Sequence, residues 1–165
     1  MLPTPPRTQL WSYAEEDAFL TVAKPRLRLA IMLFIYTAQR PGDVLAMAKI
    51  CVTARDGRLW IALLELPVHD RLAPLLCERL SAPDGLLLVS SPTGRAWVYR
   101  NVARAWDDAA RQAGILDRQR RDCRRTAVVR LADAGATVPM IAAVTGWGID
   151  YPEVAAGASR HRRQR

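Results

Sequence analysis

The stretch RDCRRTAVVRLADAGATVPMIAAVTGW, residues 121–147, decides the fold of this chain. Its pattern predicts a helix over Arg121–Ala134 closed by Gly135, because glycine just past a helix readily takes the left-handed conformation that ends it. Thr137 can then cap a second helix over Val138–Thr145. Two short helices joined by a glycine turn have the outline of a helix-turn-helix, a pattern that is weak evidence of function by itself.

Three arginines lie in the first turn of the first of these helices. Arg121, Arg124 and Arg125 are spaced i, i+3 and i+4, so they share a face at the end where the helix dipole is positive. This placement is unfavourable alone and becomes favourable when an anion binds the free backbone N–H groups and the guanidinium groups together. The alternative is that Asp117 and Asp122 neutralise the turn.

Upstream of this stretch the sequence alternates between helical and β-rich segments. Helical periodicity and capping residues predict helices over Tyr13–Ala23, Arg26–Thr37, Asp43–Ala48, His69–Ser81 and Tyr99–Ala113. Between them, Ile50–Ala54 and Arg58–Val68 are β-rich and are joined through Asp56-Gly57, a strong hairpin signal. We therefore expect an α+β fold: a mostly helical single domain with one small antiparallel β-sheet.

The basic residues are unevenly distributed in kind and in place. The chain has 24 basic and 16 acidic residues, a formal net charge of +8, and every basic residue except Lys24 and Lys49 is arginine. Residues 111–130 carry seven arginines against two aspartates, and residues 156–165 carry four arginines and no acid. This distribution is typical of a polyanion binder, most simply of nucleic acid, and arginine favours oriented phosphate contacts. The alternative is a pair of solvated basic surfaces.

Composition excludes several other classes of protein. With three widely spaced cysteines and two histidines, the chain has neither a disulfide framework nor the ligands of a tetrahedral zinc site. The longest apolar run, Leu29–Ala38, is about half of the roughly 20 residues that a membrane span needs, and the N-terminus lacks the pattern of a signal peptide. We expect a cytoplasmic protein with no membrane contact, no metal and no cofactor.

Two segments together resemble a known family. LFIYTAQRPGDVLAM, residues 33–47, is similar to the first arginine box of the tyrosine recombinase (phage integrase) catalytic domain, with Arg40 as its arginine. Residues 121–147 resemble the second box, which usually reads H-D-L-R-R-T followed by A-G and by G-H or G-W. The likeness extends over residues 11–150. It predicts a linker or arm at residues 1–11, a catalytic-like domain at 12–150 and a diverged basic tail at 151–165.

The resemblance implies a chemistry and a set of site residues. Tyrosine recombinases cut and rejoin DNA through a covalent 3′-phosphotyrosyl link, and two arginines and a His or Trp donor stabilise the transition state. Arg40 and Arg124 match the two arginines, and Trp147 matches the His/Trp donor. Arg121 stands where the family usually has histidine, and with Arg125 it completes the expected DNA-phosphate contacts. The implied partners are double-stranded DNA and other recombinase protomers, for a bacterial or phage-encoded, nucleoid-associated protein of mobile-element origin.

The sequence also departs from the family pattern. The family's general acid is a lysine on the β-hairpin, and neither Lys24 nor Lys49 lies there. The nucleophilic tyrosine is expected roughly nine to twelve residues beyond Trp147, whereas positions 156–159 are Ala, Gly, Ala and Ser. Tyr151 follows Trp147 by four residues, which makes it a doubtful nucleophile. The family's N-terminal helical domain has no counterpart either, so we expect a catalytic domain truncated at its front.

These features leave three hypotheses open. The chain is a DNA-binding family member with impaired catalysis, a working recombinase that uses Tyr151 or a partner's tyrosine, or a non-enzymatic helix-turn-helix-like DNA-binding regulator. A trapped covalent DNA intermediate would distinguish the second hypothesis from the other two. Sequence-specific binding to a promoter would distinguish the third.

Overall fold

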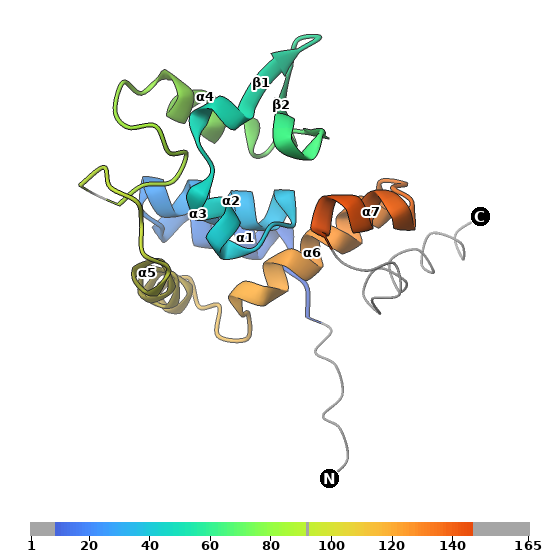
Figure 1. Ribbon diagram of the computed structural model, residues 1–165. Helices are drawn as coiled ribbons and strands as arrows, with labels where there is room; N and C mark the ends of the chain where they lie inside the picture. The colour runs from blue at the N-terminus through green and yellow to red at the C-terminus, as the bar shows by residue number, and fades with distance from the viewer. Residues whose placement is uncertain (1–8, 92, 147–165) are drawn as a thin grey trace.

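Seven helices and a small sheet make up the described part of the chain, which is residues 9–91 and 93–146 of a computed structural model (Figure 1). The helices are α1 (Tyr13–Val22), α2 (Pro25–Thr37), α3 (Pro41–Ala46), α4 (Ala73–Ser81), α5 (Tyr99–Gln112), α6 (Arg120–Asp133) and α7 (Val138–Thr145). Strands β1 (Val52–Arg55), β2 (Arg58–Ile61) and β3 (Leu66–Pro67) form one antiparallel sheet in the order β1-β2-β3. The predicted α+β class, mostly helical with a small antiparallel sheet, is confirmed.

Prolines begin helices where the sequence pattern suggested a break. α2 starts at Pro25 and α3 starts at Pro41, each earlier than predicted, because the fixed φ and missing N–H of proline suit the first helical position. Residues 70–72 form a turn before α4, which therefore starts later than the predicted His69. α5 and α6 differ from their predicted bounds by a single residue at their ends, and the bounds of α7 are those predicted.

The segment predicted as one strand over Arg58–Val68 is two strands with a turn between them. β2 ends at Ile61, Ala62–Leu64 form a short 3-10 turn, and β3 then pairs antiparallel with β2. Glu65 makes the reversal in the left-handed conformation (φ 46°), and its carboxylate binds the Arg55 guanidinium group at 2.7 and 3.1 Å. Alanine and leucine favour helical conformations more than strands, which explains why the apolar pattern alone was misleading.

The core is organised around α2, which is buried on every face from Leu29 to Thr37. A helix that is apolar all round belongs inside a protein, and α2 contacts α3, α4, α5 and α6 (Figure 1). In the same core, the rings of Trp11, Phe19 and Trp106 lie between 5.0 and 5.8 Å apart. Trp11, the last residue of the predicted arm, is buried, and its backbone N–H donates to Thr126 Oγ1 at 2.9 Å. No described helix, α2 included, is long and apolar enough to cross a membrane.

A buried carboxylate joins α1 to three other parts of the fold. Glu16 is 1% exposed, and its Oε1 lies 2.5 Å from Nη1 of Arg130 on α6. Its Oε2 accepts a hydrogen bond from the hydroxyl of Tyr36 on α2 at 2.9 Å and lies 3.4 Å from Nε of Arg71, just before α4. Burial and the hydrogen bond to Glu16 raise the pKa of Tyr36 above its ordinary value. Four separate segments of the chain therefore meet at one side chain.

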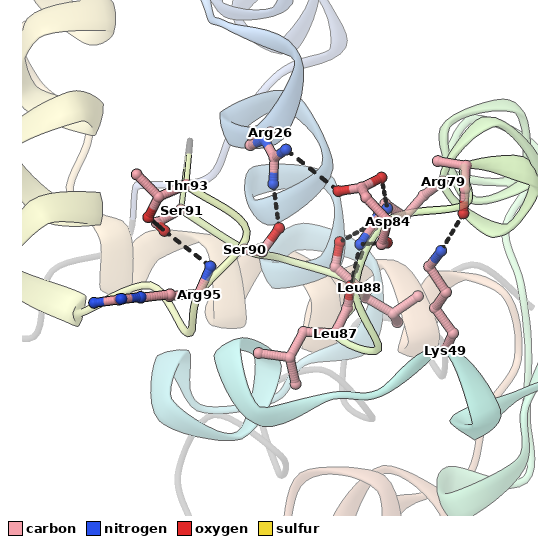
Figure 2. Close-up of polar contacts among 11 residues, drawn as sticks. Arg26, Lys49, Arg79, Asp84, Leu87, Leu88, Ser90, Ser91, Thr93 and Arg95 are labelled. Atoms are coloured by element: carbon pink, nitrogen blue, oxygen red, sulfur yellow. Dashed lines mark hydrogen bonds and ion pairs between the residues drawn. The ribbon is translucent and has the colours of Figure 1, made fainter.

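The connection between α4 and α5 is held by side chains from the elements around it (Figure 2). The described residues of this connection form isolated β-bridges in place of regular elements. Arg79 on α4 donates to the carbonyl groups of Leu87 and Leu88 and to the carboxylate of Asp84. Arg26 on α2 donates to Ser90 Oγ. Cationic side chains thus fasten this loop to two helices.

Candidate nucleic-acid interface

Arg40 reaches the surface through a sharp turn at the end of α2. Ala38 ends the helix in the left-handed conformation (φ 56°, ψ 17°) and is fully buried. Arg40, the N-cap residue of α3, then takes the extended conformation (φ −66°, ψ 148°) that a following proline favours. Its side chain is exposed and has no hydrogen-bond or ion-pair partner within residues 9–91 and 93–146. Arg40 is therefore a surface arginine whose backbone conformation is set by the turn and by Pro41.

Arg124 lies on α6 and points at the C-terminal end of α7. Its Nη2 donates a hydrogen bond to the Thr145 carbonyl at 2.5 Å. The side-chain amide of Gln39 donates to the Val144 carbonyl at 2.6 Å. Arg124 and the residue that precedes Arg40 therefore bind successive carbonyl groups of α7. The C-terminal end of α7 therefore contacts Arg124 directly and contacts the chain segment of Arg40 through Gln39, although the two arginines are distant in the sequence.

The described structure extends to the residue before the predicted Trp donor. α7 ends at Thr145, and the next residue, Gly146, has a left-handed φ of 66° and donates its N–H to the Ala142 carbonyl at 2.8 Å. This is the conformation that a closing glycine provides. Trp147 comes next in the sequence, and Trp147, Tyr151 and the predicted tail at 151–165 lie outside the described residues.

The three arginines Arg121, Arg124 and Arg125 in the first two turns of α6 have different surroundings. Asp122 is fully buried, and its Oδ2 accepts a hydrogen bond from the backbone N–H of Gln119 at 2.8 Å, which helps to cap the helix. Arg125 lies with Nη1 3.9 Å from Asp122 Oδ1. Arg121 is exposed and has no ion-pair partner in the part of the chain that is described. Asp122 therefore partly neutralises Arg125 and leaves the charge of Arg121 at the surface.

A polar cavity of about 410 Å³ lies at the start of α6. Arg120 ties this helix to α5, because its Nε donates to the Tyr99 hydroxyl at 3.1 Å and its Nη1 donates to Asp107 Oδ1 at 2.6 Å. Arg118 ties it to α1 through an ion pair with Glu15 at 2.9 Å. These contacts fix the start of α6 in position. The residues that line the cavity are Tyr99, Trp106, Asp107, Arg118, Gln119, Arg120 and Arg121.

Helix α5 carries two exposed arginines that the sequence pattern did not bring out. Arg100 and Arg104 are spaced i, i+4, so they lie on one face of α5, and neither has an ion-pair partner among the residues described. The spacing that selected the arginines of α6 could have found them. They were missed because Asp107 and Asp108 on the same helix lower its net charge.

Neither lysine of the chain lies on the β-hairpin. Lys49 precedes β1, and its ammonium group donates to the Ala82 carbonyl at the end of α4 (Figure 2). Lys24 is the exposed N-cap residue of α2. The hairpin turn is Asp56-Gly57, with both residues at positive φ, as its sequence signal predicts. Within the described ranges, no cluster of three or more His, Cys, Asp or Glu side chains could hold a metal ion.

The chain is similar in structure to solved recombinases. It matches the crystal structure of XerA recombinase with a TM-score of 0.69 and 16% identity, over 97% of this chain and 66% of that chain. It matches lambda integrase, residues 75–356, bound to DNA with a TM-score of 0.69 and 15% identity, over 92% and 61% of the two chains. A lambda integrase dimer bound to a COC′ core site matches with a TM-score of 0.66 and 16% identity, over 96% and 49%.

These matches cover nearly all of this chain and 49–66% of the length of the matched chains. No family model matches the sequence, and neither does any curated protein. A structural match at 15–16% sequence identity shows a shared fold but not a shared activity, because one fold can have many functions. The chain has a tyrosine-recombinase-like fold, as the two arginine boxes predicted.

Proposed function

We propose that the chain is a duplex-DNA-binding protein of the tyrosine recombinase type, with an impaired capacity for strand cleavage. One observation carries the proposal: Arg124 and the segment of Arg40 are fastened to the same end of α7, in a fold shared with an integrase that was crystallised on DNA. Guanidinium groups bind phosphate oxygens through paired hydrogen bonds. Such contacts position a protein on the DNA backbone.

Exposed arginines at the start of α6 and on α5 support the same function. Arg121 presents its charge at the start of α6, where backbone N–H groups and the helix dipole also favour an anion. Arg100 and Arg104 extend the basic surface onto α5, which Arg120 joins to the start of α6. Because most of these contacts would reach phosphates, we expect salt-sensitive binding with little sequence selectivity.

The residues that cleavage needs are poorly represented in this chain. In the sequence resemblance Arg121 matches the position of the family's histidine. A guanidinium group does not deprotonate, so Arg121 could hold phosphate but could not act as a base. The ammonium group of Lys49 is bound to the Ala82 carbonyl, away from the hairpin where the family's general acid lies. Tyr151 is the one tyrosine beyond Trp147, at a short spacing. An arginine pair can stabilise only a transition state that other groups create.

DNA binding is tested with a fluorescently labelled duplex, whose anisotropy is measured between about 50 and 200 mM salt. Arg40→Ala and Arg121→Ala should each weaken binding and lower the log–log salt slope by about 0.9, the value of one phosphate contact. Arg111→Ala is the charge-matched control, because Arg111 is exposed and already paired with Asp108 at 3.1 Å. Unchanged affinity and slope in both test variants would exclude a phosphate site at these residues.

Cleavage is tested with a nicked suicide duplex that traps a covalent protein–DNA adduct. We expect no adduct. An adduct that Tyr151→Phe abolishes would establish a working recombinase, and an adduct that survives this change would point to another tyrosine, including one from a partner protomer. Tight, sequence-specific binding without an adduct would instead favour the helix-turn-helix-like regulator.

A further inference from the structure

We infer that Gln39 is a positioning residue, whose side-chain amide holds the end of α7 and thereby sets the arrangement of Arg40 and Arg124. Its part in DNA affinity rests on the proposed function, whereas its effect on α7 does not. Gln39 is half-buried and lies between the end of α2 and Arg40. Its Nε2 donates to the carbonyl of Thr37 at 3.0 Å and to the carbonyl of Val144 at 2.6 Å.

The amide bridges the C-terminal ends of two helices. Thr37 is the last residue of α2, and Val144 belongs to the last turn of α7. The last carbonyl groups of a helix lack partners within that helix, and together they form the negative end of its dipole. Two such ends placed side by side repel each other unless donors lie between them. An NH₂ group, with its two protons, can serve one carbonyl of each helix.

Helix α7 is short, and its packing is limited: the partly buried Val144 packs against the main core, and the helix's fully buried side chains lie elsewhere. It spans eight residues, and its buried residues are Ile141, Ala142 and Thr145. Ile141 packs with Val128 and Ala132 of α6 in a cluster apart from the main core. The bond from Gln39 is therefore a direct link between the end of α7 and the α2–α3 turn.

The same link relates the two arginines to each other. Arg124 donates to the Thr145 carbonyl, the neighbour of the carbonyl that Gln39 holds. Arg40 follows Gln39 directly in the chain and has its backbone fixed by Pro41. If the end of α7 moved away from Gln39, the acceptor of Arg124 would move with it while Arg40 stayed at the turn. Gln39 should thus influence phosphate binding without touching DNA.

The first test measures amide hydrogen exchange by NMR in the full chain without DNA. Gln39→Met removes both donated bonds at similar volume, and Gln39→Glu places a carboxylate against two carbonyl groups. In both variants the N–H of Gly146, which donates to the Ala142 carbonyl, should exchange about threefold to tenfold faster, the effect of about one net hydrogen bond. The N–H of Val128, buried in α6, should keep its rate, which shows that the fold is intact.

The second test is a double-mutant cycle on duplex-DNA affinity. Gln39→Met should weaken binding in the parent chain and have no further effect in an Arg124→Ala background, because it acts through Arg124. Additive losses would mean that Gln39 acts independently of Arg124, which overturns the positioning role. Gln112→Met, the same change at an exposed glutamine at the end of α5, is the matched control for Gln39→Met.

The two measurements separate the failure of this inference from the failure of the proposed function. If Gly146 exchanges at the parent rate in both Gln39 variants, Gln39 does not hold α7 and the inference is wrong, whatever the DNA results. If the parent chain does not bind duplex DNA, the proposed function is wrong, and the exchange rates still decide whether Gln39 positions α7.

Discussion

Replacing Glu16 with glutamine tests the buried ionic cluster that joins the first helix to the rest of the fold. The Glu16 side chain is 1% exposed and has two arginines around it, Arg130 at 2.5 Å and Arg71 at 3.4 Å. Glutamine keeps the size of the side chain and removes its charge. Arg130, whose side chain is 19% exposed, would then remain largely buried without a carboxylate.

The size of the effect follows from this burial. Removing one partner of a buried ion pair costs about 3–5 kcal/mol, because the charge left behind stays desolvated. Arg130 keeps some compensation, since it donates to the Trp11 carbonyl at 3.0 Å and lies over the rings of Tyr13 and Tyr36 at 4.3 and 5.3 Å. We therefore expect the lower end, about 3 kcal/mol. In a chain of 165 residues this corresponds to a fall in Tm of about 6–12 °C.

The assay is urea unfolding of the full chain at pH 7, followed by circular dichroism, for the parent and for Glu16→Gln. Glu65→Gln is the matched control, because the carboxylate of Glu65 also binds an arginine, Arg55, but its side chain is 67% exposed. The control should change the unfolding midpoint far less, since water screens an exposed pair. An equally small loss of stability in both variants would mean that Glu16 is solvated in solution. The packing of α1 against α2, α6 and the turn before α4 would then not depend on its charge.

Three further outcomes are expected. Burial and the hydrogen bond to Glu16 raise the pKa of Tyr36, so this hydroxyl stays protonated in the folded chain at a pH where it ionises in the unfolded chain, about 10. The free energy of unfolding should therefore fall as the pH rises above about 10. Urea unfolding at pH 9 and 11 should show a smaller fall for Tyr36→Phe than for the parent chain. Burial also raises the pKa of the Cys123 thiol, so iodoacetamide should modify the exposed Cys77 well before Cys123. Peptide mass spectrometry measures both reactions, and equal rates of modification at the two cysteines of the folded chain would contradict the burial of Cys123. Arg124→Ala should weaken duplex-DNA binding and lower the salt slope by about 0.9, and an unchanged slope would count against a phosphate contact at this position.

The features that the sequence predicted well are those set by neighbouring residues. Asp56-Gly57 forms the hairpin turn, and the glycines after α5, α6 and α7 all take positive φ, from 66° to 91°. Thr137 caps α7 as expected, its hydroxyl accepting from the N–H of Met140. Each of these signals needs only a few residues in a row, so one sequence contains the whole of it.

The features that escaped prediction depend on contacts between distant residues. Glu16 reads in the sequence as an ordinary acid in the first turn of a helix, and only the fold brings it to Arg130. Trp11 lies in a stretch with no periodicity, yet it packs against Phe19 and Trp106. Helical spacing alone places Arg121 and Arg124 on one face, whereas the Thr145 carbonyl draws the side chain of Arg124 toward α7. No local pattern contains the second partner of such a contact.

The proposed DNA binding can be separated from strand cleavage, because different residues would support the two. The backbone at Arg40 is set by the turn at Ala38 and by Pro41, and the guanidinium group of Arg124 is bound at the end of α7. None of these contacts uses a hairpin lysine or a C-terminal tyrosine. A chain that lost the nucleophile and the general acid would therefore keep these contacts and, under the proposed function, its affinity for phosphate. The reverse does not hold, because a nucleophile without oriented arginines has no stabilised transition state to reach.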